Sequence, residues 1–205
     1  MTKQLNVLVL ESERGASDAV RGELQRAGHT VLRCHEPGTA AFPCNALAYG
    51  TRCPLDNVVD VAVDIRPRPR SQPAPLEDGV RCALQHHVPV VVVGSDMLNP
   101  FAEFATEIVG PSADVVGACE RAAEAPLREP TLAASRALQE VLTRRGVRAA
   151  PLTRVLRRDG RLVVEVHGTD LDERTKQMAS VRMVGAVRAV DHDARGIDVA
   201  FLTKA

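Results

Sequence analysis

The first 125 residues alternate between short apolar runs and amphipathic segments. The apolar runs are typical of buried parallel strands and lie at 5–10, 29–34, 58–65, 88–93 and 107–109. Between them, apolar residues spaced three and four apart predict helices at 16–27, 78–87 and 113–125. Strands that alternate with helices form parallel βαβ units with right-handed crossovers. The pattern therefore predicts a flavodoxin-like, doubly wound α/β domain over residues 1–126.

Two segments of this domain break the pattern. Residues 35–57 form an insertion in which turn-forming pairs such as Phe42-Pro43 and Cys53-Pro54 interrupt any long helix. Residues 66–75 contain four prolines, which remove backbone donors and fix φ. We expect an irregular insertion and an exposed, polyproline-like loop.

Residues 130–205 carry a different pattern and predict a smaller α+β domain. Its predicted elements are an amphipathic helix, a hairpin around Asp159-Gly160, a second helix and further extended segments, at 132–145, 152–157, 162–167, 171–185, 187–190 and 197–202. The predicted order is α-β-β-α-β.

Composition narrows the range of functions. Aromatic residues make up 2% of the chain and Trp is absent, which argues against nucleic-acid binding by base stacking. Residues 1–129 hold 12 basic and 17 acidic side chains, against 14 and 9 in residues 130–205, a dispersed asymmetry that is weak evidence for an anionic partner. The chain shows no signal peptide and no transmembrane segment, so we expect a cytoplasmic protein.

Residues 5–125 resemble the receiver domain of two-component response regulators. The positions that carry the resemblance are Glu11 and Ser12, Asp64, Asp78-Gly79, Gly94-Ser95 and Gly110-Pro111. The resemblance makes Asp64 the phosphoacceptor, with a divalent cation held by carboxylates and a Lys that pairs with the phosphate. Here Ser12 replaces a carboxylate and Gly110 replaces the Lys, so we expect a degenerate receiver in which Glu11 and Asp64 hold Mg²⁺ weakly at most.

The second part resembles a BON-type module. The resemblance rests on residues 158–164 as the hairpin, on Gly168 after the second strand and on residues 184–190 near the last turn. It implies binding to a phospholipid surface or a small ligand rather than catalysis. A ferredoxin-like or similar α+β interaction module would give nearly the same pattern.

Polar residues at the predicted strand ends suggest a binding site. The carboxyl ends of parallel strands form the natural ligand crevice of such a sheet. The residues that we expect to meet there are Glu11, Ser12, Asp64, Ser95 and Asp96. Ordinary loop structure remains the alternative for them. The chain has no phosphate loop, dinucleotide fingerprint or nucleophile elbow, so an enzyme using this crevice has the least support.

Cysteines in and before the insertion form a second candidate site. Cys44 and Cys53 lie nine residues apart, with Cys34 just before them. Thiolates ligate zinc or iron–sulfur clusters, and a reversible disulfide would close the same loop. Cys82 and Cys119 lie on apolar helix faces, and we expect both to fill the core.

These observations lead to two functional hypotheses. The first is a non-enzymatic regulatory or adaptor protein that self-associates and binds a protein partner or a small ligand. The second is a thiol-based redox sensor, or a metal sensor with Zn or Fe–S, that uses Cys44 and Cys53.

Overall fold

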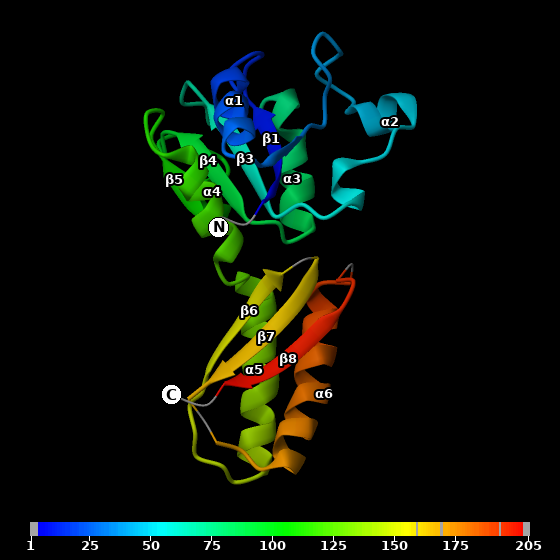
Figure 1. Cartoon of the computed structure of the whole chain (residues 1–205), viewed down its shortest axis with the longest axis vertical. Coiled ribbons are helices and arrows are strands. Elements are labelled where there is room, and N and C mark those ends of the chain that lie inside the picture. Colours follow the sequence, from blue (N-terminus) through cyan, green and yellow to red (C-terminus); the bar gives the residue numbers. More distant parts are fainter. Residues whose placement is uncertain (1–3, 159, 169, 193, 203–205) are drawn as a thin grey trace. The chain divides into compact units, whose positions relative to one another are not determined.

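The computed structural model (Figure 1) describes residues 4–158, 160–168, 170–192 and 194–202. The chain divides into two compact units, Met1–Ala125 and Pro126–Ala205. Asp159 of the expected hairpin turn lies outside the described residues. No helix within the described ranges is long and apolar enough to cross a membrane.

The first unit is built on a five-stranded parallel sheet. In sheet order its strands are β2 (Thr30–Leu32), β1 (Asn6–Glu11), β3 (Val61–Arg66), β4 (Val90–Gly94) and β5 (Glu107–Val109). This is the flavodoxin-like order, so the predicted fold class is confirmed. Every residue of β3 and β4 is buried, as expected for central strands covered on both faces.

Helices cover the two faces of this sheet (Figure 1). The α1/α4 face packs against α1 (Asp18–Arg26) and α4 (Val115–Glu124) through a cluster that includes Leu24 and Ala118. The α3 face packs against α3 (Asp78–Gln85) through Val80 and Ala83. Because side chains alternate along a strand, residues two apart point to the same face.

The insertion and the Pro-rich loop are irregular, in line with their composition. The insertion contains a short helix, α2 (Asn45–Tyr49), and a 3₁₀ turn, η1 (Pro54–Asp56), which buries Leu55 against the α3 face. After β3 the chain has no helix or strand until the 3₁₀ turn η2 (Pro75–Glu77), and residues 67–72 are exposed. A third 3₁₀ turn, η3 (Ala102–Phe104), precedes β5.

The second unit has the predicted α-β-β-α-β order. Its elements are α5 (Arg128–Arg144), β6 (Leu152–Arg158), β7 (Arg161–His167), α6 (Glu173–Val190) and β8 (Ile197–Leu202). The central strand β7 is antiparallel to β6 and parallel to β8. Both helices pack against this sheet in one core (Figure 1).

Two predictions for the helices of this unit are wrong in detail. Helix α5 begins at Arg128 instead of residue 132, because Pro130 falls in its first turn, where a missing backbone donor costs nothing. Helix α6 continues to Val190, so residues 187–190 are not extended. Val187 is buried one turn after Met183, and this helical burial outweighs the strand preference of valine.

Candidate functional site

Asp64 lies inside a strand and not at its end. β3 continues to Arg66, which pairs in register with Gly94, and the exposed fraction of Asp64 is 0%. A Cβ atom at Gly94 would lie 2.3 Å from the carbonyl oxygen of Arg66, so only glycine allows β4 to pair this far along β3. The expectation that Asp64 ends the strand at the rim of the sheet is wrong.

Glu11 and Asp64 point to opposite faces of the sheet. Leu10 is the register partner of Asp64 and belongs to the α3 face, whereas Glu11 is the partner of Ile65. The carboxylate of Glu11 accepts hydrogen bonds from Ser17 N at 2.9 Å and Ser17 Oγ at 2.7 Å, at the start of α1. The two carboxylates therefore do not meet, and the arrangement offers no shared site for Mg²⁺.

The other residues expected in the crevice form local loop structure. Ser12 is buried, and its backbone N–H donates to the carbonyl oxygen of Ile65 at 2.9 Å. Ser95 Oγ accepts a hydrogen bond from Met97 N at 3.0 Å, and Asp96 is exposed. Ser12 follows Leu10, the register partner of Asp64, by two residues, so its side chain lies on the Asp64 side of the sheet.

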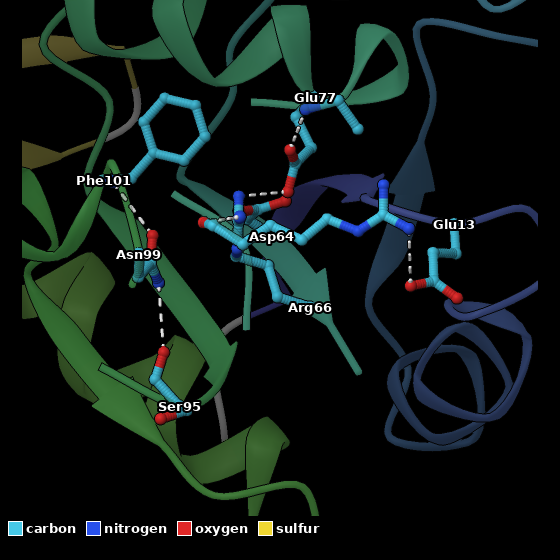
Figure 2. A network of polar contacts seen from close by, with 9 residues as sticks. Glu13, Asp64, Arg66, Glu77, Ser95, Asn99 and Phe101 are labelled. Atoms are coloured by element: carbon cyan, nitrogen blue, oxygen red, sulfur yellow. Dashed lines mark hydrogen bonds and ion pairs between the residues drawn. The ribbon is translucent and has the colours of Figure 1, made fainter. Parts of the chain in front are cut away.

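Asp64 instead belongs to a buried polar network on the α3 face (Figure 2). Arg66 Nη1 donates to Glu77 Oε1 at 2.5 Å and lies 3.9 Å from Asp64 Oδ2. Glu77 Oε2 accepts a hydrogen bond from Ala74 N at 2.5 Å, and Arg66 Nη2 donates to the carbonyl oxygen of Arg70 at 2.8 Å. The Arg66–Glu77 pair thus fastens both ends of the Pro-rich loop.

Burial decides the charge state of this network. It raises the pKa of Asp64 well above the usual value of an aspartate; the negative charge of Glu77 raises it further, while Arg66 opposes the shift. Burial also raises the pKa of Glu77, against the backbone N–H of Ala74 and the charge of Arg66. Neither oxygen of Asp64 accepts a hydrogen bond from a donor among the described residues, so a protonated Asp64 that donates to Glu77 satisfies the pair.

A surface ion pair holds the Pro-rich loop from the outside. Arg68 Nε donates to Glu13 Oε1 at 2.6 Å, and Arg70 lies 3.4 Å from the same carboxylate. The hydrogen bond from Arg68 lowers the pKa of Glu13. Exposed pairs of this kind add little stability, but they set where a loop lies.

A cleft of about 400 Å³ lies at the carboxyl ends of β1 and β2. Of the predicted crevice residues only Glu11 lines it, together with Arg14, Arg33, Cys34 and His35. Neither ring nitrogen of His35 makes a hydrogen bond of acceptable geometry within the described part of the chain, although the backbone of Ala40 lies close by. Burial lowers the pKa of His35, which favours the neutral ring.

Sequence reasoning missed the cationic and imidazole lining of this cleft. A usable signal was present, because Arg14 follows β1 and both Arg33 and His35 follow β2. In open parallel sheets ligands bind beyond the carboxyl ends of the strands. The prediction from the strand ends included only acidic and hydroxyl residues.

The cysteines of the insertion gather beside α3. Cys34 is buried in the α3-face cluster, and Cys44 and Cys53 pack against the same cluster. Asn45 N donates to the carbonyl oxygen of Cys34 at 3.1 Å, which holds the start of α2 against the end of β2. The structure therefore brings together the three cysteines that the sequence grouped.

Cys82 is not a core residue, contrary to expectation. It is exposed on α3, three residues after Gly79, where a Cβ atom would lie 2.9 Å from Cys34 Sγ. Cys119, on α4, is buried in the cluster of the opposite face, as predicted. We call Cys34, Cys44, Cys53 and Cys82 the thiol cluster.

The thiols of this cluster interact electrostatically. Burial raises the pKa of Cys34 to about 12, and the neighbouring thiols of Cys53, Cys44 and Cys82 raise it further. Cys82 is exposed, but partial burial raises the pKa of its thiol, and Cys53 and Cys44 raise it further. The described cysteines are free thiols, and no group of three or more potential ligands among the described residues could hold a metal ion.

No protein-family model matches the chain, and a search of curated proteins finds no match either.

Proposed function

We propose that the chain is a cytoplasmic, non-enzymatic regulatory or adaptor protein, with a receiver-like first unit and a BON-like second unit that act through protein or small-ligand contacts. The observation that carries the proposal is the enclosure of Asp64. This residue stands where a receiver carries its phosphoacceptor, but it has no exposed surface, and burial together with the charge of Glu77 raises its pKa well above the usual value. A protonated, sealed carboxyl is not a nucleophile.

The cleft beside β1 and β2 is the contact site that we assign for a small ligand. Its volume falls within the range of small-molecule sites, and its lining combines arginines and carboxylates with the neutral ring of His35. No interaction within the described residues engages the guanidinium of Arg33, which leaves it available to an incoming polar group. A regulatory unit of this type responds to occupancy of the cleft instead of to phosphorylation of Asp64.

Treatment with a phosphodonor tests the proposal directly. The full chain is incubated with acetyl phosphate and Mg²⁺, and its intact mass is compared with that of Asp64→Asn. We expect no added phosphoryl group in either protein. A phosphorylated wild-type chain together with an unmodified Asp64→Asn variant would contradict the proposal.

A thiol-based sensor is the second candidate function. It is supported by the packing of Cys44 and Cys53 beside Cys34 on one face of α3. The test is thiol counting before and after reduction, with metal analysis of protein purified without oxygen. We expect metal-free protein with reversibly oxidisable thiols. Thiols that stay free under every oxidant would remove this candidate.

A further inference from the structure

The thiol cluster contains one member that a loop-closing disulfide between Cys44 and Cys53 would leave out. Cys82 lies on α3, outside the insertion, and it is the only exposed residue among the described cysteines. A bond to Cys82 would tie the insertion to the helix beneath it. A bond between Cys44 and Cys53 would only close the insertion on itself.

Backbone geometry places Cys82 beside the other thiols. The side chain of Cys34 touches α3 at Gly79, and three helical residues advance the chain by about 4.5 Å. Residues three apart lie on the same side of a helix, so Cys82 follows the contact of Cys34 along one stripe of α3. Figure 1 shows the chain after α2 passing beside α3. Leu55, two residues after Cys53, packs there in the cluster of the α3 face.

Packing places Cys53 beside the part of α3 that carries Cys82. Cys53 lies directly before η1, whose Leu55 is buried in the same cluster as Val80 and Ala83, and these two residues flank Cys82 along α3. The thiol of Cys53 also raises the pKa of Cys82, in line with this placement. Cys34 lines the cleft but is 7% exposed, and burial raises its pKa to about 12, which leaves little of the reactive thiolate. The pair that combines proximity with access is therefore Cys53 and Cys82.

We propose that Cys53 and Cys82 form a reversible disulfide that ties the insertion to α3. This inference rests on the second candidate function and names its reactive pair. The oxidant is a small disulfide such as oxidised glutathione. The thiolate of Cys82 attacks one of its sulfur atoms, which releases one glutathione thiolate and leaves a mixed disulfide on Cys82. The thiolate of Cys53 then attacks the Cys82 sulfur and releases the second glutathione, so that two thiols lose two protons and two electrons in total.

The bridge would change how the insertion presents its surface. Three large apolar side chains, Phe42, Leu47 and Tyr49, are exposed on the insertion. Exposed apolar side chains that lie together are typical of interaction surfaces. Fixing Cys53 to α3 restrains the segment that carries these side chains. Oxidation is therefore expected to slow native-state cleavage by trypsin after Arg52 several-fold.

Disulfide mapping tests the proposal on the full chain. Reduced protein is equilibrated with oxidised glutathione, free thiols are blocked with N-ethylmaleimide, and the protein is digested. Trypsin separates Cys53 from Cys44 at Arg52 and releases Cys82 after Arg81, and cleavage after acidic residues separates Cys82 from Cys119. We expect a linked pair of peptides that contain Cys53 and Cys82.

Two variants and the pH dependence of the reaction test the pairing further. Cys82→Ser should abolish the linked pair, whereas Cys119→Ser, the matched control on the opposite face, should retain it. Because the raised pKa keeps Cys82 mostly protonated at neutral pH, the rate should rise up to about tenfold per pH unit. The wild-type map alone decides the pairing if a variant fails to fold.

Three outcomes overturn the inference, and they separate it from the second candidate function. A Cys44–Cys53 link, or a stable glutathione adduct on Cys82, overturns the Cys53–Cys82 bridge but keeps a thiol sensor. Thiols that remain free at every ratio of reduced to oxidised glutathione remove both.

Discussion

The two faces of the parallel sheet differ in chemistry although the same strands supply both. The α1/α4 face is an apolar cluster in which Cys119 is one more buried side chain. The α3 face combines an apolar cluster with the thiols of the insertion and with Asp64, Arg66 and Glu77. Alternation along β3 separates the two sets, because Val63 and Ile65 point one way and Asp64 the other.

The cover of each face explains the difference. Two regular helices satisfy their own backbone groups and need only an apolar stripe to pack on the sheet. The α3 face is covered partly by α3 and partly by the insertion and the Pro-rich loop, whose backbone groups have few ladder partners. Side chains provide hydrogen bonds for these backbone groups. Glu77 accepts a hydrogen bond from Ala74 N, and Arg66 donates one to the carbonyl oxygen of Arg70. The buried polar side chains of the α3 face therefore attach the irregular segments to the sheet.

The largest effect should come from breaking the buried ion pair. Arg66→Met leaves Glu77 without its cation and releases the Pro-rich loop, so we expect a loss of about 3–5 kcal/mol in the free energy of unfolding. Val63→Ala, on the opposite face of the same strand, removes only apolar contacts and should cost about 2 kcal/mol. Urea denaturation of both variants measures the difference. If Arg66→Met costs less than Val63→Ala, the network is not what fastens the loop.

A smaller effect should follow from adding one methyl group to α3. A Cβ atom at Gly79 would lie 2.6 Å from Leu10 Cδ2 as well as against Cys34 Sγ, so Gly79→Ala should cost about 1–3 kcal/mol through overpacking. Gly22 of α1 has nothing within 4 Å of its Cβ position, and Gly22→Ala should add about 0.5–1 kcal/mol of stability through helix propensity. Thermal unfolding of the two variants compares the faces. Equal changes in melting temperature for the two variants would mean that α3 moves to accommodate the added methyl group.

The sheet could be predicted because its signal is local. Val-rich runs and helical spacing in the first unit identify strands that are buried along their whole length, and the strand order follows from the alternation of elements. The hairpin and the two helices of the second unit were predicted for the same reason. The extended assignment of residues 187–190 failed because valine in a short window does not distinguish a strand from a buried helical turn.

The polar site could not be predicted because it depends on register. Whether Asp64 ends β3 or lies within it is decided by the pairing of Arg66 with Gly94, which no local pattern reveals. The partner of Arg66 is Glu77, eleven residues away across a Pro-rich loop. The exposure of Cys82 is a similar case, since helical spacing alone placed it on an apolar face, while the buried residues of α3 are Gly79, Val80 and Ala83.

The last effect is a slope of stability with pH, and it concerns the proton that burial holds on Asp64 beside Glu77. Asp64→Asn keeps a hydrogen-bond donor toward Glu77 and removes the ionisable group. In the unfolded chain Asp64 loses its proton as the pH rises past about 3.8, while burial keeps it protonated in the folded state. The folded state therefore binds more protons, and the stability of the wild type falls with rising pH from the unfolded pKa up to the folded pKa.

Asp64→Asn lacks this fall, so its stability relative to the wild type should increase as the pH rises above about 3.8, by up to about 1.4 kcal/mol for each pH unit over which the folded state keeps Asp64 protonated. Urea denaturation from pH 4 to pH 8 measures the difference between the two curves. Glu13→Gln is the matched control, because Glu13 is a surface carboxylate that pairs with Arg68 of the same loop and its pKa is lowered instead of raised. Its stability relative to the wild type should fall slightly or stay level over the same range. Parallel curves for Asp64→Asn and the wild type would mean that Asp64 is ionised in the folded protein, and the α3 face would then bury a charged carboxylate pair instead of a shared proton.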